Sequence, residues 1–133
     1  MSIYIPDILK NLLPEELITE CHSRTFNKGD HLFNQGKKPD YMYFIVSGEV
    51  ILTRANQHGE PITLQRCKGG FVSEASLLTD VYHCDGFATH SGVAITLPIQ
   101  SLRNALLNSD FSLNWVQLLS KEIMRLRTQS ERL

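Results

Sequence analysis

The chain has 133 residues, of which 42% are hydrophobic and 20% charged, as expected of one globular domain with a hydrophobic core. Thirteen lysines and arginines balance fourteen aspartates and glutamates, and this near-neutral charge disfavours nucleic-acid binding by the chain itself. The sequence has no apolar stretch near the roughly 20 residues that span a bilayer and no secretory signal, so we expect no membrane contact.

The N-terminal segment, residues 1–24, has helical apolar spacing from Ile8 to Cys21, and Pro14 suits the start of a fresh helical turn. From residue 25 to residue 98 the pattern changes to short runs of branched and aromatic residues, and all eight glycines lie there. This pattern predicts many short strands joined by turns, as in a sandwich or barrel.

Two hairpins are predicted within this β region. The first turns at Ser47-Gly48, where glycine can supply the positive φ of a two-residue turn, and the second turns in the polar loop 55–60. A further strand over Gly92–Leu97 stops at Pro98, because proline cannot donate to a β ladder. The strands that the two hairpins join are 41–46, 49–54 and 61–66.

Helical spacing returns over residues 99–133. A short helix begins at Ile99, and Ser109 or Asp110 can cap a long last helix from about Phe111. Along this helix, apolar residues recur in alternating steps of 3 and 4, the a/d spacing of a coiled coil, with one serine among them. This apolar stripe consists of Val116, Leu119, Ile123, Leu126, Ser130 and Leu133.

The apolar stripe has two interpretations. Val116 and Leu119 can pack on the chain's own β region, as in a monomer, whereas Ile123, Leu126 and Leu133 extend beyond it. Because an exposed apolar stripe on a long helix marks a partner surface, we favour a homodimer formed through this helix.

One stretch combines these features in a specific pattern. From Gly29 to Val50 the sequence reads G-D-x-L-F-x-x-G-x-x-x-D-x-x-Y-F-I-x-x-G-x-V. This pattern resembles the front half of the cyclic-nucleotide-binding domain, the β-roll sensor of the CRP/FNR family of bacterial transcriptional regulators. The resemblance implies a mainly β, α+β fold over residues 1–133: a jelly-roll-like double-stranded β-helix with an N-terminal helix and a long C-terminal dimerisation helix. In the family, polar residues on that helix reach the nucleotide base, so Thr128, Gln129 and Ser130 are candidates by position.

A second motif resembles the family's phosphate-binding cassette, which reads roughly F-G-E-x-x-L-L. Here Phe71 begins the motif, and Glu74 matches the acid that accepts a hydrogen bond from the ribose 2′-hydroxyl. Ser73 stands where the family has glycine, and its Cβ is expected to crowd the approach of the sugar-phosphate. The candidate ligand-binding residues are Phe71, Ser73, Glu74, Ala75, His83, Cys84, Asp85 and Thr128.

The cassette departs from the family at Cys84, where the family has an arginine. That arginine neutralises the cyclic phosphate through two charge-assisted hydrogen bonds, which neither cysteine nor neutral histidine can replace. No lysine or arginine occurs between Lys68 and Arg103, and Asp85 would repel a phosphate. Losing a buried charge partner costs about 2–5 kcal/mol, so we expect tight cyclic AMP binding by the usual mechanism to be lost. A protonated His83 is the alternative phosphate partner; otherwise it is a loop residue in solvent.

The other signals read by this family leave little trace here. An iron–sulfur cluster needs about four thiolates, and only Cys21 lies near the N-terminus. The adjacent pair His83-Cys84 could in principle ligate haem, but a free cysteine is more often a small buried hydrophobe. A redox-sensing Cys84 thiol needs a nearby cation, and Asp85 acts in the opposite direction. With three cysteines, including Cys67, and no CxxC spacing, we expect reduced thiols in a cytoplasmic protein and no metal site.

The sequence therefore predicts the effector-sensing and dimerisation part of a CRP/FNR-like regulator, with a non-standard effector or none. Family regulators contact DNA through a helix-turn-helix that follows the long helix, and this sequence contains no such unit. The chain is therefore expected to be either the sensor part of a longer regulator or a stand-alone sensor, and the end of the sequence on the apolar stripe favours the first. The alternatives are a degenerate sensor that only dimerises or docks a partner, and a cyclic AMP receptor with a modified pocket. No catalytic set of side chains stands out at a meaningful spacing, so we do not expect an enzyme.

Overall fold

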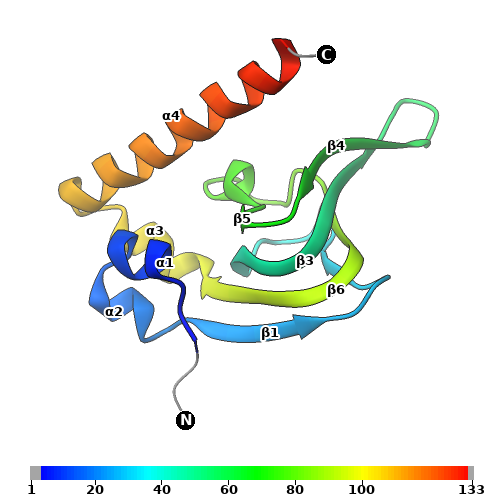
Figure 1. The fold of residues 1–133 in the computed structure, drawn as a ribbon. Helices are drawn as coiled ribbons and strands as arrows, with labels where there is room; N and C mark the ends of the chain where they lie inside the picture. Colours follow the sequence, from blue (N-terminus) through cyan, green and yellow to red (C-terminus); the bar gives the residue numbers. More distant parts are fainter. Residues whose placement is uncertain (1–3, 132–133) are drawn as a thin grey trace.

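The computed structural model of the chain describes residues 4–131 and shows a curled antiparallel sheet flanked by helices (Figure 1). This arrangement confirms the predicted β-roll with helices on both sides of it in sequence. The elements follow in the order α1 (Asp7–Leu12), α2 (Glu15–Ile18), β1 (His22–Phe26), β2 (His31–Phe33), β3 (Tyr41–Ala55), β4 (Pro61–Cys67), β5 (Gly70–Phe71), η1 (Glu74–Ser76), β6 (Asp85–Pro98), α3 (Ile99–Ala105) and α4 (Ser109–Glu131).

The two long strands β3 and β6 form the centre of the sheet. They pair antiparallel from Tyr41 opposite Pro98 to Thr53 opposite Asp85, and the strand order across the sheet is β1-β6-β3-β4. The short strands β2 and β5 extend β6 and β3 respectively. The predicted hairpin over residues 55–60 is confirmed as the connection between β3 and β4.

The predicted hairpin at Ser47-Gly48 is wrong, because β3 passes through these residues without reversing. Gly48 does have the expected positive φ, +84°, but here it lies in a bulged part of the β3–β6 ladder, where the pairing register shifts. The strand bends at this point and continues, since β6 accompanies it on both sides of the bulge. Because β6 pairs with β3 on both sides of the bulge, β6 begins at Asp85, well before the predicted start at Gly92.

The helices begin and end according to local sequence rules, and the predicted cap of the last helix needs correction. Leu13, which precedes Pro14, is extended with ψ of 143°, so the N-terminal helical segment divides into α1 and α2. The cap of the last helix is Asn108, rather than Ser109 or Asp110, because its side-chain oxygen accepts a hydrogen bond from the Phe111 N–H at 3.0 Å. Within the described residues, no helix is long and apolar enough to cross a membrane.

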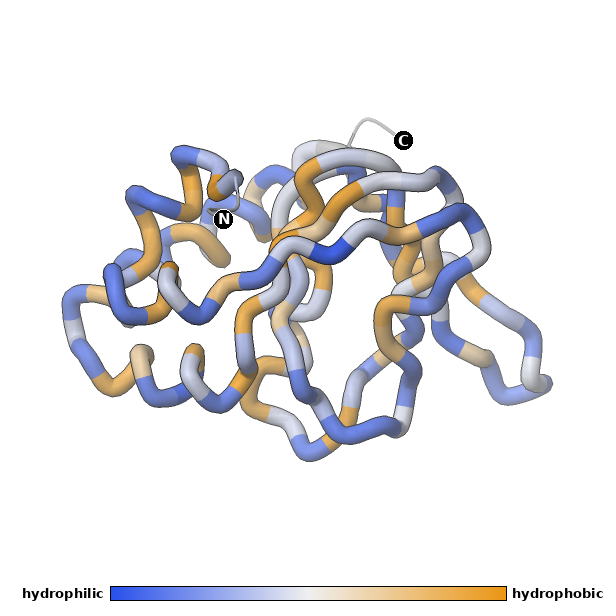
Figure 2. The backbone as a smooth tube through the Cα atoms, turned by 90° about the horizontal axis from the view of Figure 1, so that it is seen from below, coloured by the Kyte–Doolittle hydropathy of each residue, from blue (hydrophilic) through white to orange (hydrophobic). Residues whose placement is uncertain are grey.

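Two hydrophobic clusters hold the fold together. The roll interior contains Phe33, Tyr43 and Tyr82, whose rings stack face to face around Phe33. The second cluster joins the outer face of the sheet to the helices and includes Trp115 of α4. Figure 2 shows hydrophobic and hydrophilic residues mixed along the strands, as expected where one face of each strand is buried.

Helix α4 faces the roll with a different set of residues from the predicted one. Phe111 and Trp115 are buried against the second cluster, and Leu118 and Leu119 are half-buried there. Val116, one of the two residues expected to pack on the roll, is instead 56% exposed. It lies on the outer side of α4, because one residue along a helix turns by about 100°.

Candidate functional site

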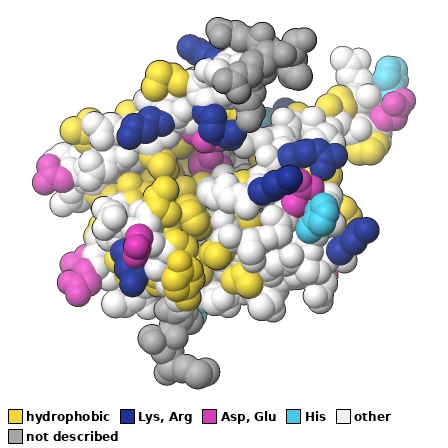
Figure 3. Space-filling model, in the orientation of Figure 1, with side chains coloured by type: hydrophobic (Ala, Val, Ile, Leu, Met, Phe, Trp, Pro, Cys, Tyr) yellow, Lys and Arg dark blue, Asp and Glu magenta, His cyan; other side chains and the backbone are white. Residues whose placement is uncertain are grey.

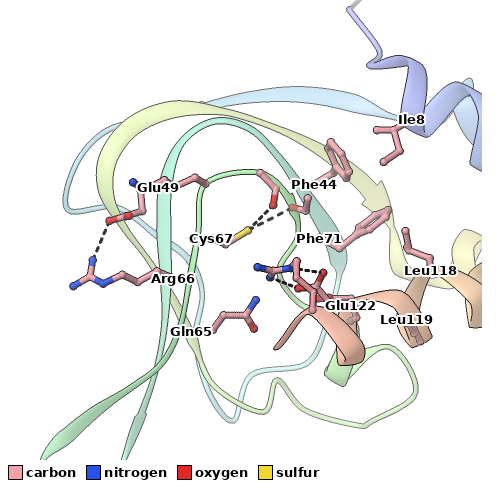
Figure 4. Close-up of a pocket in the computed structure, with 15 residues that line it drawn as sticks. Ile8, Phe44, Glu49, Gln65, Arg66, Cys67, Phe71, Leu118, Leu119 and Glu122 are labelled. Carbon is pink, nitrogen blue, oxygen red and sulfur yellow. Dashed lines mark hydrogen bonds and ion pairs between the residues drawn. The ribbon is translucent and has the colours of Figure 1, made fainter. Parts of the chain in front are cut away.

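A cavity of about 520 Å³ lies between the roll and α4 (Figure 4). Its walls come from four parts of the chain that are distant in sequence: α1, β3, the segment from β4 to η1, and α4. The lining residues from the roll side include Phe44, Glu49, Gln65, Arg66, Cys67, Lys68, Phe71 and Glu74, and those from the helices are Ile8, Leu118, Leu119, Glu122 and Arg125.

Glu74 is the ionisable residue of the cassette in this cavity. Burial raises the pKa of its carboxyl to about 7, the nearby Glu122 carboxylate acts in the same direction, and the backbone N–H of Glu74 opposes them. At neutral pH this carboxyl is therefore close to half protonated, and it can accept hydrogen bonds or donate one.

The other two carboxylates of the cavity are paired. Glu49 is 4% exposed, accepts a hydrogen bond from the Thr89 hydroxyl at 2.5 Å and pairs with Arg66 at 3.1 Å. The Thr89 hydroxyl is the main reason that the pKa of Glu49 is lowered. On α4, Arg125 donates two hydrogen bonds to Glu122, which lowers the pKa of the Glu122 carboxyl.

Among the predicted ligand residues, Phe71 and Glu74 line this cavity, and the rest of the cassette does not. Ser73 is buried, and its hydroxyl lies 3.2 Å from the sulfur of Met42, so its side chain points into the core. The expected crowding by its Cβ therefore falls on the core rather than on the cavity. Ala75 is exposed on η1.

The three consecutive candidates His83, Cys84 and Asp85 lie elsewhere. His83 is exposed, and its backbone N–H donates to the Ser76 hydroxyl. Cys84 is buried in the roll interior. Asp85 accepts a hydrogen bond at 2.6 Å from the backbone N–H of Gln35, so it anchors the β2–β3 loop.

The candidates on α4 are only partly described. Thr128 is exposed, and its hydroxyl donates to the Met124 carbonyl one turn earlier, at 3.0 Å. The side chains of Gln129 and Ser130 and the whole of Leu133 lie outside the described residues.

The sequence reasoning missed the α4 residues that do line the cavity. Leu118, Glu122 and Arg125 follow one another at steps of 4 and 3, which places them on one face of the helix. The same helical spacing that revealed the apolar stripe could have revealed this second face, but a mixed apolar and charged face gives a weaker pattern.

The three cysteine thiols are free and buried, and burial raises the pKa of Cys21, Cys67 and Cys84 to about 11 in each case. At about pH 8 roughly one thiol in a thousand is then ionised. We expect the native protein to react with the chromogenic disulfide reagent DTNB at least about 100-fold more slowly than the chain unfolded in guanidinium. A thiol that reacts rapidly in the native state would contradict the burial, and a Cys84→Ser variant would show whether Cys84 is responsible.

Comparison with known proteins agrees with this fold. The family model described as the cyclic nucleotide-binding domain matches residues 23–109. A comparison of the sequence with curated proteins finds no significant match.

Several solved structures share the fold at low sequence identity. The sensor domain of the transcriptional regulator DNR from Pseudomonas aeruginosa is 21% identical with a TM-score of 0.71, over 95% of this chain and 87% of that one. The catabolite activator protein of Thermus thermophilus is 21% identical with a TM-score of 0.72, over 95% of this chain and 62% of that one. The N-terminal domain of a transcriptional regulator from Streptomyces coelicolor is 21% identical with a TM-score of 0.66, over 94% of this chain and 90% of that one. The chain spans 59% and 61% of two further matched structures, so it corresponds to about three fifths of such proteins.

Proposed function

The chain belongs to the cyclic nucleotide-binding domain family, and from this premise we propose that it is the effector-sensing and dimerising part of a CRP/FNR-type transcriptional regulator. The function is regulatory: it requires binding and a change in packing, and no chemical reaction. We assign DNA contact to a helix-turn-helix outside this sequence. The three buried free thiols support a reducing compartment, and we propose the cytoplasm.

One observation carries this proposal: residues of the roll and residues of α4 line the same cavity. Phe71 and Glu74 of the cassette region and Leu118 and Arg125 of α4 line the same space. An effector in the cavity would contact the roll and the long helix together, and so would favour one packing of α4 on the roll over another. Such a population shift is how a sensor changes the placement of whatever is attached to its helix.

The outer side of α4 supports the dimer. Val116 and Ile123 are 56% and 49% exposed, and Leu126 and Met124 are exposed beside them. Figure 3 shows lysine and arginine side chains along α4. Val116, Ile123 and Leu126 recur at coiled-coil spacing, in steps of 7 and 3, so they form a surface for a second copy of α4.

The dimer is tested by replacing Ile123 with glutamate and measuring the mass in solution by sedimentation equilibrium. In a symmetric pair of helices the two new carboxylates would face each other, so we expect the dimer dissociation constant to rise by about 100-fold or more. The matched control is Leu107→Glu, which places the same charge on an 87% exposed leucine outside the stripe and should leave the dimer intact. A wild-type monomer, or equal effects of the two variants, would contradict dimerisation through α4.

A second candidate function is an interaction module that dimerises or docks a partner without an effector. The position of Cys84 in the roll interior favours this candidate, because the residue that should hold the cyclic phosphate is a buried thiol. The two functions differ in whether the cavity binds a small molecule, which the experiment in the next subsection decides.

A further inference from the structure

The charges around the cavity disfavour a phosphate at its cassette end. From residue 69 to residue 102 the chain has no lysine or arginine, and the cassette side contributes the carboxyl of Glu74. Helix η1 has only three residues, too few to act as a helix N-terminal anion site. A phosphate next to Glu74 would therefore face an acid with no compensating cation from the same segment.

The three cations that line the cavity are Arg66 of β4, Lys68 just after β4 and Arg125 of α4, and the two arginines are already paired. Arg66 is bound to the buried Glu49, and Arg125 is bound to Glu122. Lys68 is exposed to solvent, where its charge is screened. Moving either arginine to a ligand would take the guanidinium away from its carboxylate, and for the buried Glu49 the Thr89 hydroxyl and the His90 ring would then be the groups left beside it.

Glu74 is available to a ligand. Within residues 4–131, no other residue donates a hydrogen bond or forms an ion pair with its carboxyl. Leu118 and Leu119 of α4 and Phe71 of β5 form an apolar part of the cavity wall (Figure 4). A volume of about 520 Å³ is in the range of small-molecule pockets.

We propose that this cavity takes an uncharged ligand whose hydroxyl groups donate hydrogen bonds to Glu74 and whose flat apolar part lies against Leu118 and Leu119. An unphosphorylated nucleoside is the simplest molecule of this class. The inference rests on the proposed sensing function of the same cavity and names the chemistry of its effector.

A neutral ligand and an anionic ligand are expected to change the protonation of Glu74 in opposite directions. Hydroxyl groups that donate to the Glu74 carboxylate favour its charged form, so a neutral ligand releases a proton when it binds. An anionic ligand at the same place favours the protonated form, so it takes up a proton. The other ionisable groups facing Glu74 are Glu122 of α4, Cys67 of β4 and Cys84 before β6. The two thiols stay protonated near pH 7 because burial raises their pKa to about 11, and the Arg125 pair keeps Glu122 ionised.

The experiment compares adenosine with cyclic AMP, which differ by the phosphate. Each is titrated calorimetrically into the protein at about pH 7 in two buffers of different ionisation enthalpy, which yields the number of protons exchanged. We expect adenosine to bind at least about ten-fold more tightly than cyclic AMP. Since the pKa of Glu74 is about 7, adenosine should release up to about half a proton.

The variant Glu74→Gln should weaken adenosine binding and abolish the proton release, while Glu60→Gln, in the exposed β3–β4 loop, should change neither. Tighter binding of cyclic AMP, or uptake of a proton, would overturn the inference and leave the sensing function standing. Binding of neither ligand at millimolar concentration would overturn the inference and would favour the interaction module over the sensing function. Dimerisation through α4 is tested separately, by the Ile123→Glu variant.

Discussion

Replacement of Gly92 by alanine is expected to destabilise the protein by at least about 3 kcal/mol, at the upper end of what overpacking costs. A Cβ at Gly92 would lie 2.0 Å from the carbonyl oxygen of Ser47 and 2.7 Å from the Cα of Gly48. Both are backbone atoms of β3, which cannot rotate away as a side chain does. The alanine would therefore force β3 and β6 apart at the bulge on which the curl of the roll depends.

Thermal and urea unfolding followed by circular dichroism would measure this change. For a chain of this size the midpoint should fall by about 10 °C or more. Gly69→Ala is the matched control, because Gly69 lacks a positive φ and the nearest atom to its Cβ, the Ile45 carbonyl oxygen, lies 3.8 Å away. That variant should stay within about 0.5 kcal/mol of the wild type. Equal stabilities of the two variants would show that β3 and β6 do not approach closely at Gly92.

Replacement of Trp115 by alanine is expected to cost about 3–5 kcal/mol, the usual range for a buried aromatic side chain. Trp115 is 3% exposed, and its ring meets that of Phe71 at 5.0 Å and that of Phe111 at 6.1 Å between centroids. It is the largest side chain that joins α4 to the roll, and Phe71 lines the cavity. Its loss should loosen α4 and weaken ligand binding together with stability.

Trp115→Phe is the matched variant for this test. Within the described residues, the indole N–H of Trp115 is a buried side-chain donor without a partner, so phenylalanine removes an unsatisfied group while keeping most of the apolar contact. We expect a cost below about 1.5 kcal/mol in chemical unfolding. Because Trp115 is the single tryptophan of the chain and is 3% exposed, we expect the wild type to have blue-shifted emission that reports the packing of α4. A large and equal loss in both variants would contradict a role that depends on apolar packing.

The errors of the sequence interpretation concern features that depend on distant segments. The Ser47-Gly48 signal was correct about the positive φ but not about the reversal, because pairing with β6 on both sides of the bulge keeps β3 continuous. Asn108, Ser109 and Asp110 are all good capping residues, and the packing of Phe111 into the core selects the register in which Asn108 is the cap.

The candidate site was likewise predicted only in the part that depends on a local motif. Phe71 and Glu74 were identified from the cassette motif, and both line the cavity. The direction in which Cys84 points could not be predicted, because neighbouring residues of a loop can face either side of a sheet. The contribution of Arg125 could not be predicted either, since it depends on how α4 lies across the roll.

The sequence by itself determined the fold class, the positive φ of Gly48, the hairpin over residues 55–60, the amphipathic last helix and the absence of a cation from the cassette. These features follow from local chemistry: the period of apolar residues, the freedom of glycine and the identity of each side chain. Only the tertiary structure decided which residues form the cavity, which of its charges are paired and which side of α4 is left exposed. These depend on distances between segments far apart in the chain, because burial and charge pairing arise only when β3, the cassette and α4 come together.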